Sequence, residues 1–448
     1  MGRLCLFKCY ECSGKNARNI IDMCIKQNKK IVSGGTLFTH EYEKFPGVTH
    51  FVLNEAEITL SVFIKDLQNG YPKHIYKSVH FADIQSTPVP KWELVDLNKY
   101  LYSIVQYSRR YPYLCDFCDV TALFGREPRV KSRTQILDEL DLLLKHRKNE
   151  MIFFADDNLI GNKKLLKQDL LPALIEWRSK NIYAPTFATQ LTVNLADDPE
   201  LMKILLEAGF RHILISIESL QTDSLEQMKK KQNTKRNLLE NIKLLQSKGF
   251  IVIGTFIVGL DNYKEEIFPN LAGFIQESGL ILVVVNVLKA PPGTVLYERM
   301  KKENRLVDTL EFNEDRTNII PVMDKKILHN GYKMVLRNIY NPENALQRIL
   351  TYYSNLNTDG VKNSIKRKVT LRDFFIFIGI IFKLEIVFSK RNYFWQLILW
   401  TIKNKRNYLD LSILFSLLMF QYHNLFNAFL NNEKKELIFT RNNSTLNS

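Results

Sequence analysis

The stretch Tyr111-Pro112-Tyr113-Leu114-Cys115-Asp116-Phe117-Cys118 decides how the rest of this 448-residue chain is interpreted. Cys115 and Cys118 fit the second half of the spacing C-x3-C-x2-C, and Tyr111 stands where its first cysteine would be. A compact loop with three such cysteines holds a 4Fe–4S cluster through three thiolates and leaves one iron open. We therefore predict Cys115 and Cys118 as metal ligands. Cluster assembly depends on residue 111, because a phenol is a poor ligand for this cluster.

A strand–helix alternation runs from about residue 101 to 305. Short apolar stretches predict strands, and apolar residues at helical spacing predict the helices between them. The predicted strands are residues 103–107, 151–155, 183–189, 212–217, 250–258 and 280–288, and the predicted helices include 134–147, 163–180, 222–231, 234–248 and 295–303. Six such units indicate a parallel sheet with its helices outside, and they are too few for a closed eight-stranded barrel.

Polar residues and glycines follow the predicted strands at their carboxyl ends, where ligands gather in such folds. They are Cys115 and Cys118 after the first strand, Asp156-Asp157-Asn158 after the second, Gln190 after the third, Glu218 after the fourth, Gly259 after the fifth and 291–294 after the sixth. Glu218 ends an apolar strand, where a carboxylate is costly to bury without a partner. The acidic run after the second strand also suits a turn with helix capping.

The two ends of the chain have different patterns. In residues 1–100 we predict helices at 19–27 and 55–68, strands at 30–32 and 48–53, and a tight turn at Gly34-Gly35. Residues 306–448 lack the alternation and are predicted to be mainly helical. Their apolar runs 374–382 and 409–420 are shorter than the ~18–20 residues that span a bilayer. They suit core or cap helices, or an interfacial pair that makes a peripheral membrane contact through 374–420.

Charge and cysteine usage narrow the functional classes. The net charge of the chain is +15, but its basic residues form short runs that are scattered along the sequence, such as Lys229-Lys230-Lys231 and Lys325-Lys326. We interpret them as solvated surface and expect no specific nucleic-acid partner. Six cysteines in this length do not form a disulfide framework, and an iron–sulfur ligand needs a reducing compartment, so we expect a cytoplasmic protein with membrane association as the alternative. No signal peptide is recognisable.

Residues 105–120 resemble the cluster loop of radical S-adenosylmethionine (SAM) enzymes, especially the cobalamin-binding subgroup. There the stretch usually reads S-R-G-C-P-Y-x-C-x-F-C-D, so Arg110 replaces a glycine and Tyr111 replaces a cysteine. The resemblance continues through 154–158, 217–219, 254–259 and 292–294, and covers roughly residues 20 to 430. It implies an open six-unit (β/α) partial barrel at 101–305, preceded by a doubly wound domain at 1–100 and followed by a helical domain at 306–448.

The resemblance also implies cofactors and residue roles. The cofactors are a 4Fe–4S cluster, SAM and cobalamin, and the reaction is a radical step such as methyl transfer to an unactivated carbon. Phe117 matches the aromatic residue that lies against adenine, and Glu218 a ligand of the methionine or ribose part of SAM. The remaining matches are Asp156, Asp157 and Asn158 at the amino group of SAM, Gly254 and Gly259 near its adenine, and Gln190 as a polar contact.

The first hundred residues match a cobalamin domain in part. Residues 54–57 read Asn-Glu-Ala-Glu, which is common in such domains, and a pair like Gly34-Gly35 lets backbone approach the nucleotide tail of the cofactor. In related proteins that pair comes late in the domain, so about half of the expected sheet is missing before it. No D-x-H-x-x-G motif is present. We therefore expect a truncated doubly wound domain.

Three alternatives stay open. Cys5, Cys9 and Cys12 have the full C-x3-C-x2-C spacing, but the short segment before them predicts no strand to present them. The second alternative is a degenerate paralogue that keeps the barrel without a full cluster. The third is a membrane-docked or RNA-associated binding protein. As an enzyme, it would act on a small molecule or a lipid, as some hopanoid-modifying relatives do, with a flavodoxin or ferredoxin as one-electron donor.

Overall fold

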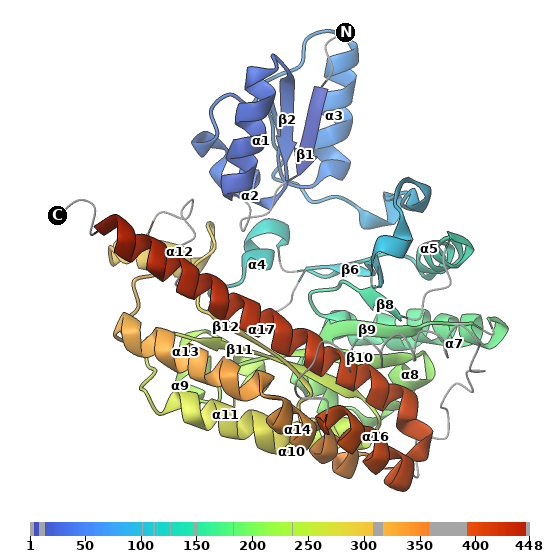
Figure 1. The fold of residues 1–448 in the computed structure, drawn as a ribbon. Coiled ribbons are helices and arrows are strands. Elements are labelled where there is room, and N and C mark those ends of the chain that lie inside the picture. Colours follow the sequence, from blue (N-terminus) through green and yellow to red (C-terminus); the bar gives the residue numbers. More distant parts are fainter. Residues whose placement is uncertain are drawn as a thin grey trace.

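The computed structural model describes residues 4–8, 14–100, 102–110, 113, 115–125, 127–146, 151–181, 183–234, 236–307, 317–357 and 392–444. Figure 1 shows a parallel sheet at the centre, a smaller parallel sheet at the N-terminal end, and helices of the C-terminal third packed beside the central sheet. This arrangement confirms the predicted partial barrel followed by a mainly helical region, and the unit that precedes the barrel is a parallel α/β sheet whose strands lie in sequence order.

The central sheet has six strands in the order β12-β11-β10-β9-β8-β5, all parallel. Their bounds are β5 Ser103–Val105, β8 Met151–Phe154, β9 Thr186–Leu191, β10 Phe210–Glu218, β11 Ile251–Val258 and β12 Leu282–Val287. One face of each strand is buried under the surrounding helices, as Ile213, Ile215 and Ile217 show on β10. Alternate residues on the other face are half-buried or exposed, so the sheet has a dry side and an open side.

Each predicted strand of this sheet is present within a few residues. The largest shift is in β9, predicted at 183–189, because Pro185 lacks the N–H that a ladder position needs. The helices between and after the strands are α4 Asp119–Phe124, α5 Arg133–His146, α6 Lys163–Leu165, α7 Leu171–Lys180, α8 Pro199–Glu207, α9 Thr222–Gln227, α10 Leu238–Ser247, α11 Ile267–Ser278 and α12 Val295–Lys302. A π-helical turn, Leu166–Leu170, joins α6 to α7.

The N-terminal unit is a four-stranded parallel sheet in the order β1-β2-β3-β4. Its elements are β1 Leu4–Lys8, α1 Gly14–Lys26, β2 Lys30–Gly34, α2 Thr36–Glu41, β3 His50–Val52, α3 Ala56–Gln68 and β4 Ile75–Tyr76. Sequence patterns predicted β2, β3, α1 and α3 but missed β1 and β4. The expectation that no strand presents Cys5 was wrong, because Cys5 lies within β1 and pairs in register with Ile31. Cys9 and Cys12 lie outside the described residues.

The C-terminal third is helical where the structure describes it, with α13 Lys325–Tyr340, α14 Pro342–Asn355, α16 Asn392–Asn404 and α17 Leu409–Ser444. The apolar run 409–420 forms the start of α17, and Phe415, Met419 and Phe420 are buried against neighbouring helices. This run is therefore core, whereas the run 374–382 lies outside the described residues. Within the described ranges, no helix combines the length and apolar character that crossing a membrane requires.

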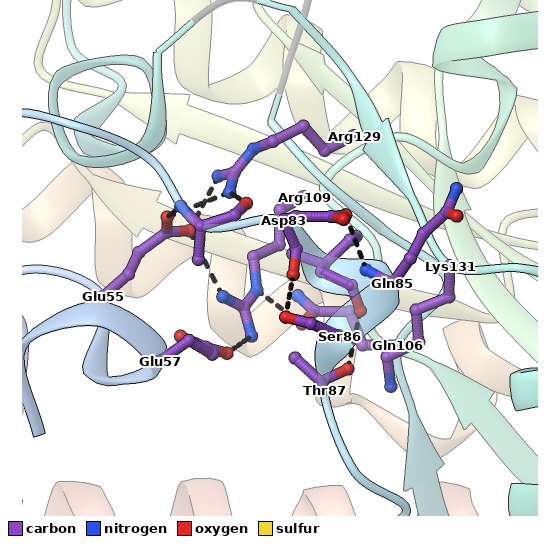
Figure 2. A network of polar contacts seen from close by, with 12 residues as sticks. Glu55, Glu57, Asp83, Gln85, Ser86, Thr87, Gln106, Arg109, Arg129 and Lys131 are labelled. Carbon is purple, nitrogen blue, oxygen red and sulfur yellow. Dashed lines mark hydrogen bonds and ion pairs between the residues drawn. The ribbon is translucent and has the colours of Figure 1, made fainter. Parts of the chain in front are cut away.

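Glu55, at the start of α3, connects the N-terminal unit to the barrel (Figure 2). Its carboxylate oxygens accept bonds from both outer nitrogens of Arg129, at 2.7 and 2.9 Å, and from Arg109 at 3.2 Å. Arg109 also donates to Glu57 at 2.6 Å. The two arginines face each other in the antiparallel ribbon formed by β6 Ser108–Arg109 and β7 Arg129–Val130. Two like charges in that position repel each other, so the ribbon depends on the buried carboxylate between them.

The charge state of Glu55 sets the pH range of this connection. Burial raises the pKa of Glu55, but the bonds from Arg129, the Ala82 N–H and Arg109 outweigh it, so the pKa lies below its ordinary value of 4.5. A lowered carboxyl pKa contributes stability that is fully present above the unfolded value and is lost as the pH falls through the folded value. The connection should therefore be intact at neutral pH and weaken only in acid.

We predict that Glu55→Gln loosens the N-terminal unit at neutral pH, at a cost of about 3 kcal/mol, because Arg109 and Arg129 lose their shared charge. Limited proteolysis of the connecting segment 77–100, measured from neutral pH down to below 4.5, reports on it. The native chain should become sensitive only in acid, and the variant at every pH. Asp96→Asn is the control, since Asp96 forms an exposed 3.9 Å pair with Lys99. Equal cleavage of both variants would contradict the prediction.

Candidate functional site

The cysteine loop lies at the carboxyl edge of the central sheet, directly before α4. Cys115 is buried and Cys118 is half-buried, at the residue that precedes α4. Burial raises the pKa of the Cys115 thiol, and it raises that of Cys118 to about 11, so both are protonated until a metal displaces the protons. Tyr111 lies outside the described residues, and among the described ones no three His, Cys, Asp or Glu side chains gather as a metal site.

Arg110 has a backbone conformation that favours glycine. Its φ is 95°, a region that side-chain-bearing residues rarely adopt. The guanidinium lies over the ring of Phe81, 4.0 Å from its centroid, and its Nε is buried without a hydrogen-bond partner. The arginine at this predicted glycine position thus strains the turn: it adopts a conformation that favours glycine and packs on Phe81.

A short loop after α9 connects the cysteine loop to the end of β10. The Met228 carbonyl accepts from the Asp116 N–H at 3.3 Å, and Lys229 pairs with Asp116 at 2.9 Å. Lys230 is buried and donates to the Glu218 carboxylate at 2.9 Å. It also lies close enough to Cys115 to oppose the effect of burial on the thiol pKa. Residues 228–230 therefore place the Cys115 thiol and the Glu218 carboxylate near one buried ammonium group.

Lys230 corrects one interpretation of the sequence. The run Lys229-Lys230-Lys231 was taken as solvated surface, but the Lys230 side chain is only 3% exposed. Lys229 is 51% exposed and fits the expectation. Local sequence gave no signal for this difference, because the partner of Lys230 lies twelve positions away at the end of a strand. Gln232, which hydrogen-bonds the Cys115 thiol, was missed for the same reason.

Glu218 ends β10 with a φ of 67°, a second residue in the left-handed region. Asn233 supports this turn by donating to the carbonyls of Ser216 and Ile217, both at 2.9 Å. The Glu218 side chain is 8% exposed, so the expected partner for a buried carboxylate is present in Lys230. The strained backbone aims one carboxylate at the carboxyl edge of the sheet.

The residues after β8 differ in what they do. Asp156 is fully buried and accepts from the N–H groups of Tyr107 and Ser108 and from the Ser108 hydroxyl, although burial still raises its pKa to about 6. Asn158 accepts from the Thr192 N–H at 3.3 Å. Both side chains thus fix neighbouring loops. Asp157 is half-buried next to the Arg110 N–H, and burial raises its pKa to about 6. Of these three, Asp157 is the side chain best placed to meet a ligand.

The remaining candidates also separate by position. Gln190 lies on the open side of the sheet and donates to the Ser216 hydroxyl at 3.2 Å, whereas Phe117 packs against the main core. Gly259 follows β11 with a φ of 88°, which favours glycine. Gly254 was expected near a ligand but lies on the dry side of β11: a Cβ there would come 2.8 Å from Leu280. The small size of Gly254 accommodates core packing.

The carboxyl edge of the N-terminal sheet faces the carboxyl edge of the barrel. Gly34 ends β2, where a Cβ would lie 2.6 Å from the Val52 carbonyl oxygen, and Gly35 has a φ of 103° before α2. At the end of that helix, His40 contacts the loop after β12, since a Cβ on Gly293 would lie 2.6 Å from its ring. Figure 1 shows α2 close to α4 and α12. The Gly34-Gly35 turn and the cysteine loop are therefore on facing surfaces.

The buried pair between Lys230 and Glu218 can be tested by stability. We predict that Lys230→Met lowers the free energy of unfolding by about 3 kcal/mol, because it leaves the Glu218 carboxylate buried and unpaired. Lys229→Met, at the exposed neighbouring pair, should cost less than about 1 kcal/mol. Chemical denaturation measures both, and Lys230→Met/Glu218→Leu should recover most of the loss. If Lys230→Met and Lys229→Met cost the same, the pair does not hold this loop.

Comparison with known proteins places these observations in a family. Residues 108–275 match the model of the radical SAM superfamily, and residues 294–435 match a domain of unknown function, DUF4070. The chain is similar to an uncharacterized methyltransferase of Synechocystis sp., at 34% identity over 71% of this chain and 60% of the relative. It is also similar to the hopanoid C-2 methylase of Rhodopseudomonas palustris, at 36% identity over 59% and 50%. The chain thus spans half to three fifths of the length of these relatives.

Solved structures support the fold. A cobalamin-dependent SAM radical enzyme, OxsB, superposes with a TM-score of 0.60 at 15% identity, covering 95% of this chain and 75% of that one. The radical SAM methyltransferase TsrM of Kitasatospora setae superposes with a TM-score of 0.54 at 14% identity, over 67% of both chains. With its CxxC loop at the carboxyl edge of a six-stranded parallel sheet, the chain contains a radical SAM superfamily domain at residues 108–275, followed by a DUF4070 region at residues 294–435.

Proposed function

We propose that this protein is a SAM-binding enzyme of the radical methyltransferase type. One observation carries the proposal: Cys115 and Glu218 come from two different strand ends and meet at Lys230, at the edge of the sheet where such folds bind ligands. The proteins to which the chain is similar include methyltransferases, among them a hopanoid C-2 methylase. A radical SAM site supplies one-electron cleavage of a sulfonium; the protein supplies ligands, orientation and exclusion of water.

The chain fits the three implied cofactors to different degrees. SAM presents an ammonium and a sulfonium, and Asp157 after β8 and Glu218 at the end of β10 are carboxylates at the same edge of the sheet that suit positive groups. For cobalamin we assign the Gly34-Gly35 turn, at the edge of the N-terminal sheet that faces the barrel. The 4Fe–4S cluster fits least, because Cys115 and Cys118 provide two thiolates where three are needed. An added small thiol is the third ligand that would complete the set.

We assign roles to the site residues on this basis. Cys115 and Cys118 hold metal, Phe117 backs the adenine side of the site, and Asp157 binds the amino group of SAM. Glu218 binds the methionine or ribose part, with Lys230 holding its carboxylate in place. The other residues have supporting roles. Asp156 and Asn158 fix the loops beside the site, Gln190 lies on the open face of the sheet, and Gly259 lies at a strand end. Gly34 and Gly35 belong to the side that would bind cobalamin.

The wider setting is also a proposal. We divide the chain into a cobalamin-binding-like domain at 1–100, a radical SAM barrel at 101–305 and a helical domain at 306–448. The substrate is a small molecule or a lipid, and the electron donor is a flavodoxin or ferredoxin. The protein works in the cytoplasm and makes a peripheral contact with a membrane.

A second candidate is a degenerate paralogue that keeps the barrel without radical chemistry. Two observations favour it: Tyr111 replaces a cluster cysteine, and Arg110 occupies a glycine conformation in the same loop. The loop therefore carries two adjacent substitutions, one that removes a ligand and one that strains the turn.

Anaerobic reconstitution with iron and sulfide separates the two candidates. If the enzyme proposal holds, the native chain takes up about four irons when a small thiol is added and then absorbs light at about 400 nm. It also cleaves SAM to 5′-deoxyadenosine. Arg110→Gly/Tyr111→Cys should reach the same iron content without the added thiol, because the variant supplies the third thiolate and relieves the turn.

Two controls make the result specific to the loop. Cys115→Ser should abolish iron uptake, while Cys24→Ser, which changes a cysteine in α1, should leave it unchanged. If only the Arg110→Gly/Tyr111→Cys variant takes up iron and cleaves SAM, the degenerate paralogue is the correct description. If neither does, the cysteine loop is not a cluster site.

A further inference from the structure

Helix α16 carries an apolar stripe on its solvent side. Trp395, Leu399 and Ile402 follow the spacing i, i+4, i+7, which places them on one face of a helix. Leu399 is 64% exposed and Ile402 is 47% exposed, and Trp395 is half-buried. Phe394, Leu397 and Ile398 on the opposite face are buried against α14 and α17. The helix is therefore apolar on both sides, and among the described residues one side packs in the core while Leu399 and Ile402 on the other are exposed.

The sequence that contains this stripe is basic. Residues 386–409 include Lys390, Arg391, Lys403, Lys405 and Arg406 and no aspartate or glutamate, and the exposed Asp410 follows directly. Lys403 and Arg406 are exposed in the structure, next to Ile402 at the end of the helix.

We infer that α16 lies on the surface of a bilayer that contains anionic phospholipid. Apolar residues enter the acyl boundary from an interfacial helix while basic residues meet lipid phosphates, and a tryptophan suits the headgroup level. The stripe and its basic border have this composition. Figure 1 places α16 at the opposite end of the molecule from the N-terminal unit, so docking leaves both facing sheet edges accessible. The inference gives the proposed membrane contact a location and does not depend on radical chemistry.

The full chain, without added cofactor, is tested by co-sedimentation with vesicles. One set is phosphatidylcholine, and the other contains about a third phosphatidylglycerol. We expect binding to be at least about tenfold tighter on the anionic set and to weaken strongly from about 50 to about 500 mM NaCl. Absence of binding, or equal binding to both sets, would overturn the inference.

Two surface variants separate the apolar and the electrostatic contributions. Leu399→Ser/Ile402→Ser should weaken binding to anionic vesicles about tenfold, and Lys403→Gln/Lys405→Gln/Arg406→Gln should remove the preference for them. The matched control is Leu244→Ser on α10, which changes another exposed leucine (37%) and should bind as the native chain does. All the changed leucine and isoleucine side chains are solvent-exposed, so the melting temperatures should agree.

Insertion has its own measurement. Brominated phospholipid should quench the tryptophan fluorescence of the native chain, and Trp395→Phe should lose most of that quenching. The alternative partner for the apolar stripe of α16 is a second copy of the chain, and light scattering tests for that dimer. A dimer that Leu399→Ser/Ile402→Ser converts to a monomer, without any vesicle binding by the native chain, would overturn the inference in favour of self-association.

Discussion

The Glu55 carboxylate is the interaction on which the arrangement of the two α/β units depends. It is buried between Arg109 and Arg129, and these belong to the ribbon that leads into the cysteine loop. The same ion group therefore fixes the N-terminal unit and the start of the loop. Without the carboxylate, two guanidinium groups would face each other across a two-stranded ribbon, and Arg129 would lose its pairing with Glu55. Glu57, in the first turn of α3, extends the connection by binding Arg109.

Most of the barrel is readable from the sequence because its signals are local. Strands such as β10 and β11 are apolar runs followed by helices with one apolar face, and those patterns need no knowledge of partners. The missed elements are the short ones: β4 has two residues, and β1 is a strand only because β2 pairs with it. A strand defined mainly by its neighbour gives little periodicity to detect.

The site residues show where sequence reasoning stops. The pattern identified Glu218 as a buried carboxylate that needs a partner, but it could not find Lys230, which looked like part of a solvated basic run. Asp156 stood at a strand end like its neighbour Asp157, yet its oxygens are used by Tyr107 and Ser108, almost fifty residues earlier in the chain. Gly254 was predicted to lie near a ligand because it is a glycine, but it lies on the face of β11 that packs in the core. Each difference arises from a contact between distant segments.

Backbone strain is concentrated around the same edge of the sheet. Arg110 and Glu218 both have positive φ values, and each begins or ends a segment that faces the cysteines. At Glu218 the strain has support: Asn233 holds the preceding carbonyls, and Lys230 pairs the carboxylate. At Arg110 the support is packing on Phe81, and the Nε remains without a partner. Strain persists only where the surroundings impose it, and at Glu218 they fix the carboxylate at the edge of the sheet. At Arg110 they hold an arginine in a conformation that favours glycine.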